Sequence, residues 1–230
     1  MNIQLHFTKT GFGPPLLLLH GNGEDSSYFT HQIEDFSRDF TVYAVDTRWH
    51  GRSPRGAAPF TLDQFADDLC AFMDRQALDR ADILGFSDGG NIALLFALRY
   101  PDRVRRLILN SANLYPEGLE PWLLESFREE RRGLRYAEHP DAERQAALLD
   151  LMIHEPHIDP AALRGLTMPA LVIAGDRDII QFDHTLCIAG SLPGARLSML
   201  PGGHDVAAVH PAAFNAAVRA FFEESKEAFV

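Results

Sequence analysis

Apolar residues in this chain form short runs, separated by longer segments in which they recur with helical spacing. Two runs alternate polar and apolar residues, as half-exposed edge strands do, and they cover residues 3–8 and 196–200. The other runs are almost wholly apolar, which is typical of parallel strands buried on both faces. These buried runs cover residues 16–20, 41–46, 82–86, 106–110 and 170–174.

Helical segments lie between the strand-like runs through most of the chain. They cover residues 27–38, 61–76, 91–100, 183–191 and 211–227. Because strands and helices alternate, the strands are expected to form one mostly parallel sheet with helices on both faces. The sequence therefore predicts the α/β fold class.

Residues 114–167 interrupt this alternation. No strand-like run occurs there, charged residues are dense, and Pro116, Pro156 and Pro160 divide the segment. Its spacing fits two or three amphipathic helices, roughly over residues 119–138 and 141–154. We interpret 114–167 as a helical cap inserted into a core formed by residues 1–113 and 168–230.

Composition narrows the class of partner. The chain has 230 residues and a formal net charge of −11, which argues against nucleic acid or an anionic membrane as a main partner. The two cysteines suggest neither a disulfide framework nor a metal site. With no signal-peptide pattern and no apolar run that could span a bilayer, a cytoplasmic protein is expected. The oligomeric state is not predicted.

A motif with chemical meaning lies after the strand expected at residues 82–86. Gly85-Phe86-Ser87-Asp88-Gly89 joins that strand to a helix, and Gly-x-Ser-x-Gly in this context is typical of a nucleophile elbow. Glycine is needed at 85 and 89 because side chains there would collide with the neighbouring backbone. Ser87 is therefore the candidate nucleophile.

A serine hydroxyl needs a base, and the base needs an orienting group. His204 lies in the loop 201–205 after a predicted strand and is the candidate base. Asp178 follows another strand and is the preferred acid, with Asp176 two residues away as the alternative. The chain order Ser87, Asp178, His204 is the order found in α/β-hydrolases.

With these motifs the chain resembles the α/β-hydrolase superfamily, and in particular its small, cap-bearing, esterase-like members. The resemblance includes residues 16–23 and 46–53 and extends over nearly the whole chain. It implies an eight-stranded core sheet, an oxyanion hole formed by the backbone N–H groups of Asn22 and Asp88, and no cofactor. Trp49 and Asp88 depart from the residues that are common at their positions in the family.

Two groups of side chains in the predicted cap have open interpretations. An apolar stripe either lines an acyl pocket, together with Trp49, or only attaches the cap to the sheet. A group of arginines either holds a substrate carboxylate or forms a solvated face paired with glutamates. The stripe is Leu119, Trp122, Leu123 and Phe127, and the arginines are Arg128, Arg131, Arg132 and Arg135.

These features predict a serine hydrolase that acts on a small, mostly uncharged ester or related acyl compound without a metal or cofactor. Two alternatives remain open. The first is a carbon–carbon bond hydrolase or lyase, since enzymes of these kinds use the same three residues on similar folds. The second is a non-catalytic binding protein, although Ser87, Asp178 and His204 are all present in this chain.

Overall fold

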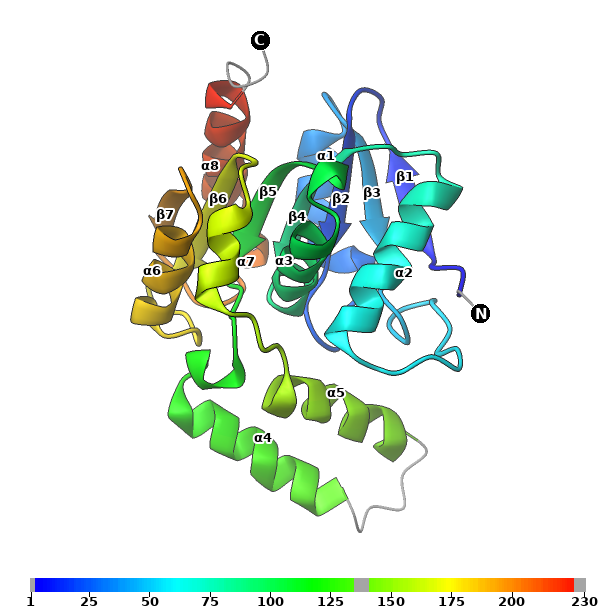
Figure 1. Cartoon of the computed structure of the whole chain (residues 1–230), viewed down its shortest axis with the longest axis vertical. Helices are drawn as coiled ribbons and strands as arrows, with labels where there is room; N and C mark the ends of the chain where they lie inside the picture. The colour runs from blue at the N-terminus through cyan, green and yellow to red at the C-terminus, as the bar shows by residue number, and fades with distance from the viewer. Residues whose placement is uncertain (1–2, 135–140, 226–230) are drawn as a thin grey trace.

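A single seven-stranded sheet organises the computed structural model, which describes residues 3–134 and 141–225 (Figure 1). The strand order is β1-β3-β2-β4-β5-β6-β7; β1 pairs antiparallel with β3 and the other pairs are parallel. The strands are β1 Phe7–Thr10, β2 Pro15–Leu19, β3 Thr41–Val45, β4 Ala81–Phe86, β5 Val104–Asn110, β6 Ala170–Gly175 and β7 Arg196–Leu200.

The sheet differs from the expectation of eight strands. Among the described residues, one strand precedes β2, and the connection between them is a turn with positive φ at Gly11 and Gly13 that leaves no length for another strand. The edge strand also begins at Phe7 rather than at residue 3. Ile3 and Leu5 are buried, as the alternating pattern predicts. Residue 3 is nevertheless outside the strand, and its carbonyl accepts a hydrogen bond from the Arg75 side chain.

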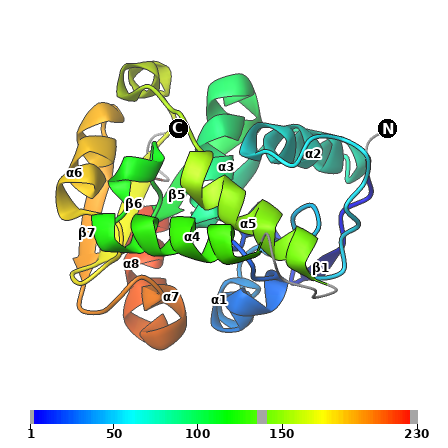
Figure 2. The ribbon, with the colours of Figure 1, turned by 90° about the horizontal axis from the view of Figure 1, so that it is seen from below.

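Helices cover both faces of the sheet (Figure 2). Adjacent strand residues point to opposite faces, so Ile83 of β4 joins one apolar cluster and Leu84 joins the other. One face is covered by α2 Leu62–Arg75, α3 Asp88–Arg99 and α6 Phe182–Ser191; the other is covered by α1 Thr30–Phe36, α7 Val206–Val209 and α8 Pro211–Glu224. The predicted α/β class is confirmed.

Two further helices lie between β5 and β6 in sequence and beyond the end of the sheet in space (Figure 1). These are α4 Pro121–Gly133 and α5 Ala142–His154, which pack side by side, and we call them the helical insertion. Proline occupies the first helical position of α4, where its missing N–H is not needed. Within the described residues no helix is long and apolar enough to cross a membrane.

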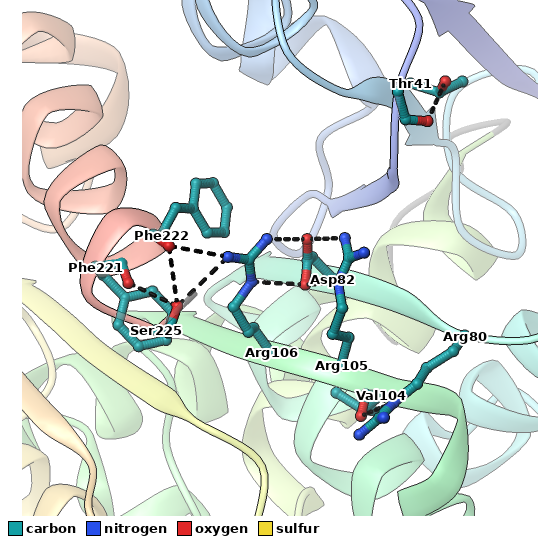
Figure 3. A network of polar contacts seen from close by, with 10 residues as sticks. Thr41, Arg80, Asp82, Val104, Arg105, Arg106, Phe221, Phe222 and Ser225 are labelled. Atoms are coloured by element: carbon teal, nitrogen blue, oxygen red, sulfur yellow. Dashed lines mark hydrogen bonds and ion pairs between the residues drawn. The ribbon is translucent and has the colours of Figure 1, made fainter. Parts of the chain in front are cut away.

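The opposite end of the sheet is fixed by a buried ion cluster around Asp82 (Figure 3). Asp82 is fully buried, and its carboxylate accepts hydrogen bonds from both Arg105 and Arg106 of the neighbouring strand. Arg106 donates further to the Phe222 carbonyl and to Ser225 at the end of α8. One carboxylate thus compensates two guanidinium groups and connects β4, β5 and α8.

Removal of the Asp82 charge is expected to destabilise the fold. In Asp82→Asn the two arginines lose their shared counter-charge, and breaking a buried ion pair typically costs about 3–5 kcal/mol. Urea unfolding of the variant measures this loss in the free energy of unfolding. The control is Asp102→Asn, an exposed carboxylate, which should change stability by less than about 0.5 kcal/mol. Equal stabilities of the two variants would contradict the assigned role of the cluster.

Candidate active site

Ser87 occupies a tight turn between β4 and α3 that only glycine neighbours permit. Its φ is +52°, a conformation that L-residues rarely adopt. A Cβ at Gly85 would lie 2.2 Å from the Gly89 carbonyl oxygen, and a Cβ at Gly89 would lie 2.0 Å from the Leu19 carbonyl oxygen. The Ser87 N–H donates to the Asn110 carbonyl at 2.8 Å. The turn is therefore held against both adjacent strands.

The structure brings Ser87, His204 and Asp178 together in one line of hydrogen bonds. Ser87 Oγ lies 3.0 Å from His204 Nε2, and His204 Nδ1 lies 2.7 Å from Asp178 Oδ1. Each residue comes from a loop at the carboxyl end of a parallel strand, β4, β7 or β6. With this geometry the imidazole is in position to accept the hydroxyl proton while the carboxylate faces the other ring nitrogen.

The Asp178 carboxylate is kept ionised by its partners. Burial raises its pKa, but hydrogen bonding to His204, the proximity of that ring and the Ser111 hydroxyl outweigh burial and hold the pKa below the usual range. Ser111 Oγ donates to Oδ2 at 2.6 Å, and the Ile180 N–H donates to Oδ1 at 3.0 Å. Sequence reasoning missed Ser111, whose contact depends on the pairing of β5 with β6.

Asp176, the alternative acid, lies in a different environment. Its Oδ1 accepts a hydrogen bond from the Gly202 N–H at 2.9 Å, in the loop that carries His204. A Cβ at Gly175 would lie 2.2 Å from the Gly203 carbonyl oxygen, so the two loops pass very close to each other. Asp176 thus shapes the loop, and Asp178 is the acid that contacts the histidine.

The loop after β2 lies beside Ser87 and is braced by polar contacts. His20 Nδ1 lies 2.8 Å from the Gly21 carbonyl oxygen, and its Nε2 accepts a hydrogen bond from the Thr47 N–H. Burial lowers the pKa of His20, more than the Gly21 carbonyl and nearby carboxylates raise it, and the ring is therefore neutral. This brace fixes the backbone next to Asn22, the expected oxyanion-hole residue.

Asn22 and Asp88 are held to each other by their side chains. Asn22 Nδ2 donates to Asp88 Oδ2 at 2.9 Å and to the Leu148 carbonyl of α5 at 3.2 Å. Asp88 begins α3, where the first backbone N–H groups have no partner within the helix. Burial raises the pKa of Asp88, and hydrogen bonds from Asn22 and Asn91 oppose that rise. The oxyanion role of the two backbone N–H groups stays a prediction.

A pocket of about 210 Å³ opens beside Ser87 and is walled by the helical insertion on one side. Its lining combines apolar side chains with carboxyl groups. The apolar members are Phe86, Leu119, Phe127, Met152 and Ile179, and the carboxyl members are Glu24, Asp88, Glu155 and Asp205. The described residues include no group of three or more His, Cys, Asp or Glu side chains arranged to hold a metal ion.

Only part of the predicted apolar stripe reaches this pocket. Leu119 and Phe127 line it, and Leu123 packs against the small cluster that Leu119 forms with Leu124. Trp122 does not line it: the side chain is 65% exposed. Since Trp122 precedes the buried Leu124 by two residues, the helical turn directs it to the outer face of α4. Trp49 also lies elsewhere, packed edge-on against Phe60.

The arginines of the insertion pair with acids outside the pocket. Arg131 forms two hydrogen bonds with Asp150, at 2.8 and 2.9 Å, and Arg128 and Arg132 both contact Glu125. Arg135 lies outside the described residues. None of the three described arginines lines the pocket at Ser87.

Glu24 is a pocket carboxyl that sequence reasoning also missed. Its Oε2 accepts a hydrogen bond from the Gly21 N–H at 3.1 Å. Burial raises the pKa of Glu24 to about 7, although the Gly21 N–H and the nearby His204 oppose the rise. Its position directly after the His20-Gly21-Asn22-Gly23 motif is the signal that could have identified it.

A serine on a strand–turn–helix elbow, with histidine and aspartate from later strand ends of a mostly parallel sheet, defines the α/β-hydrolase class. The profile of the alpha/beta hydrolase fold family matches residues 14–154 of this sequence. The chain belongs to that family, and hydrolases are among its relatives, which supports an enzyme of the hydrolase class.

Among the relatives, 2-hydroxymuconate semialdehyde hydrolase from Pseudomonas sp. is 30% identical and covers 99% of this chain and 93% of its own. A solved esterase from Thermogutta terrifontis superposes with a TM-score of 0.83 at 26% identity, covering 97% of this chain and 94% of that one. An uncharacterized protein from Mycobacterium tuberculosis is 35% identical over 46% of this chain. The matched part corresponds to 31% of the length of that protein, so this chain spans about a third of it.

Glu24 gives the stability a defined pH dependence. In the unfolded chain the Glu24 carboxyl group has a pKa near 4.5, whereas in the folded protein its pKa is about 7. Because the folded state binds more protons in this window, the contribution of Glu24 to stability is present at low pH and lost as the pH rises through about 7. Urea unfolding should therefore show wild type losing stability relative to Glu24→Gln between pH 5 and pH 8. A difference that does not change with pH would rule out a raised pKa for Glu24.

Proposed function

We propose that this protein is a carboxylesterase-like serine hydrolase of small acyl compounds, with residues 114–167 acting as a cap over its active site. The observation that carries the proposal is the unbroken line from Ser87 Oγ through both ring nitrogens of His204 to Asp178. Ser87 is the nucleophile, His204 the general base and Asp178 the group that orients the imidazole.

The chemistry follows from these positions. Ser87 Oγ attacks the ester carbonyl carbon while His204 Nε2 takes the hydroxyl proton, and the carbonyl oxygen becomes an oxyanion. The backbone N–H groups of Asn22 and Asp88 stabilise this charge. The protonated imidazole then gives its proton to the leaving alcohol. His204 then takes a proton from a water molecule as its oxygen attacks the acyl carbonyl carbon. The bond between this carbon and Ser87 Oγ breaks, His204 returns the proton to Ser87 Oγ, and the acid is released.

The size of the pocket supports a small substrate. A volume of about 210 Å³ holds a short acyl or alcohol group rather than a long chain. The structural similarity to an esterase of Thermogutta terrifontis favours an ester bond. No cofactor takes part in the proposed reaction.

A second candidate function uses the same residues for carbon–carbon bond hydrolysis. The observation in its favour is the 30% identity to a 2-hydroxymuconate semialdehyde hydrolase, an enzyme named for a substrate other than a simple ester. The pairing of Arg128, Arg131 and Arg132 with acids outside the pocket argues against an arginine clamp for a carboxylate substrate. A non-catalytic binder is disfavoured because the three reacting side chains are all in contact.

Hydrolysis of p-nitrophenyl acetate tests the proposal. Ser87→Ala removes the nucleophile, and we expect kcat/KM to fall by at least about a thousandfold. Thermal unfolding of the same variant checks that the fold persists. If wild type is inert on esters while Ser87 still reacts with a fluorophosphonate, the nucleophile is competent but esters are the wrong substrate class. An active Ser87→Ala would refute the mechanism.

A matched pair of variants controls for the acid in the same assay. Asp178→Asn removes the charge that faces His204 and should lower kcat by roughly 10³–10⁴. Asp176→Asn alters only the loop contact to Gly202 and should have a much smaller effect. Comparable losses in the two variants would contradict the assignment of Asp178.

The apolar wall predicts where acyl-chain selectivity resides. Phe127 lines the pocket and Trp122, five residues earlier on the same helix, is exposed. Phe127→Ala should raise kcat/KM for p-nitrophenyl hexanoate relative to acetate by about fivefold or more, because the pocket is lengthened. Trp122→Ala is the control and should leave this ratio at its wild-type value. A shifted ratio in Trp122→Ala alone would place the acyl pocket elsewhere.

A further inference from the structure

The pocket beside Ser87 is lined by acids with a single titratable base. Its carboxyl groups come from four different segments: Glu24 after β2, Asp88 at the start of α3, Glu155 after α5 and Asp205 before α7. Among the described residues that line it, His204 is the one side chain able to carry a positive charge, and no lysine or arginine is present. The reacting serine therefore lies among carboxyl groups whose ionisation makes the pocket negative, although burial raises the pKa of Glu24 and of Glu155.

Two arginines of the insertion, Arg131 and Arg144, are bound to groups outside the pocket. Arg131 is paired with Asp150 on the far side of α5, and Arg144 Nε donates to the Trp49 carbonyl at 2.9 Å. Neither lines the pocket. Arg131 is thus neutralised by Asp150, and neither arginine is in position to contact a ligand inside the pocket.

Two of the carboxyl groups each have one oxygen atom that accepts a backbone hydrogen bond and a second that could accept one from a ligand. Glu24 uses one oxygen for the Gly21 N–H, and Glu155 uses one for the Leu62 N–H at 2.7 Å. Within the described part of the chain, the second oxygen of each has no hydrogen-bond partner. Asp88 differs, because Asn22 and Asn91 donate to its two oxygens. Glu24 and Glu155 are thus the two partly buried carboxyl groups of the pocket that can accept a new donor, whereas Asp205 is exposed.

We propose that this pocket selects esters that carry an alkylammonium group close to the scissile carbonyl, with Glu24 and Glu155 as the carboxylates that bind the cation. The inference rests on the proposed ester hydrolysis and gives it a substrate class. Burial raises the pKa of both carboxyl groups, so a nearby cation would restore charges that the pocket itself disfavours. The half-buried ring of Phe127 also lines the pocket and adds an aromatic surface of the kind on which alkylammonium groups pack well.

The same arrangement disfavours anionic substrates when Glu24 and Glu155 are ionised. A carboxylate in the pocket would face Glu24 and Glu155 with no arginine or lysine among the described lining residues. Like charges at short range in a partly buried site repel strongly. Discrimination should therefore follow the order cationic, neutral, anionic for substrates of one shape.

Two sets of isosteric esters test this order. The first set is the methyl esters of alanine, 2-methylpropanoic acid and methylmalonic acid (monoester), which place an ammonium, a methyl or a carboxylate beside the carbonyl. The second is acetylcholine and 3,3-dimethylbutyl acetate, which place the charge in the alcohol. Each kcat/KM is divided by the alkaline hydrolysis rate of the same ester, to remove differences in intrinsic reactivity.

We expect the cationic ester to exceed its neutral isostere by at least about tenfold in one of the two sets, which corresponds to about 1.4 kcal/mol. The monoester of methylmalonic acid should be the slowest of the first set. Serine-dependent hydrolysis with cationic and neutral esters equal in both sets would overturn the inference and leave the proposed function intact.

Single substitutions locate the binding groups. Glu24→Gln and Glu155→Gln keep an acceptor for the backbone N–H but remove the charge, and each should lower the cationic-to-neutral ratio by about threefold or more. Glu130→Gln removes an exposed charge from α4 outside the pocket and should keep the wild-type ratio. Wild-type ratios in both pocket variants would refute the assignment of these carboxylates.

A binding readout covers the case in which no ester is hydrolysed. Failure of all five esters and of p-nitrophenyl acetate would refute the proposed ester hydrolysis, and the charge preference is then measured by protection of Ser87 from a fluorophosphonate. Alaninamide should protect at a concentration at least about tenfold lower than its neutral isostere, 2-methylpropanamide. Equal protection by the two amides would refute the preference for a cation independently of turnover.

Discussion

The close approach of the first turn of α3 to the ends of β2 and β4 is the constraint on which the site depends. A Cβ atom at Gly89 would collide with the Leu19 carbonyl oxygen, and a Cβ atom at Gly85 would collide with the carbonyl oxygen of Gly89. This contact holds Ser87 at a positive φ, and α3 begins at the next residue, so that the first turn of the helix lies beside the serine. Movement of α3 away from the sheet would alter the serine, Asp88 and Asn91 together.

The remaining groups reach Ser87 from rigid parallel strands rather than from free loops. Asp178 follows β6 and His204 follows β7, and the glycines at 175 and 203 let these two strand ends pass within backbone contact. The sheet therefore sets the acid–base geometry, while the helical insertion supplies a wall. The pocket wall is thereby shared between the insertion, with Phe127 and Met152, and the loops of the core, whereas the three residues in line come from the core alone.

Much of this arrangement could be predicted from the sequence because it is written in local patterns. Buried strands are continuous apolar runs, α2 has clear helical spacing, and the elbow motif fixes Ser87. What depended on tertiary pairing was not predictable. Ser111 reaches Asp178 only through the neighbouring strand, Trp122 faces outward because Leu124 sets the rotation of α4, and the eighth strand implied by resemblance is absent from the described residues.

The side chain of Asn22 has a mechanical consequence. Its single amide nitrogen donates both to Asp88, next to the reactive serine, and to the Leu148 carbonyl of the insertion. If α5 swung outward to let a product leave, the second bond would break and the loop after β2 would lose a tether. Displacement of α5 and loosening of the loop after β2 would then be one event, because the same amide nitrogen connects both to Asp88.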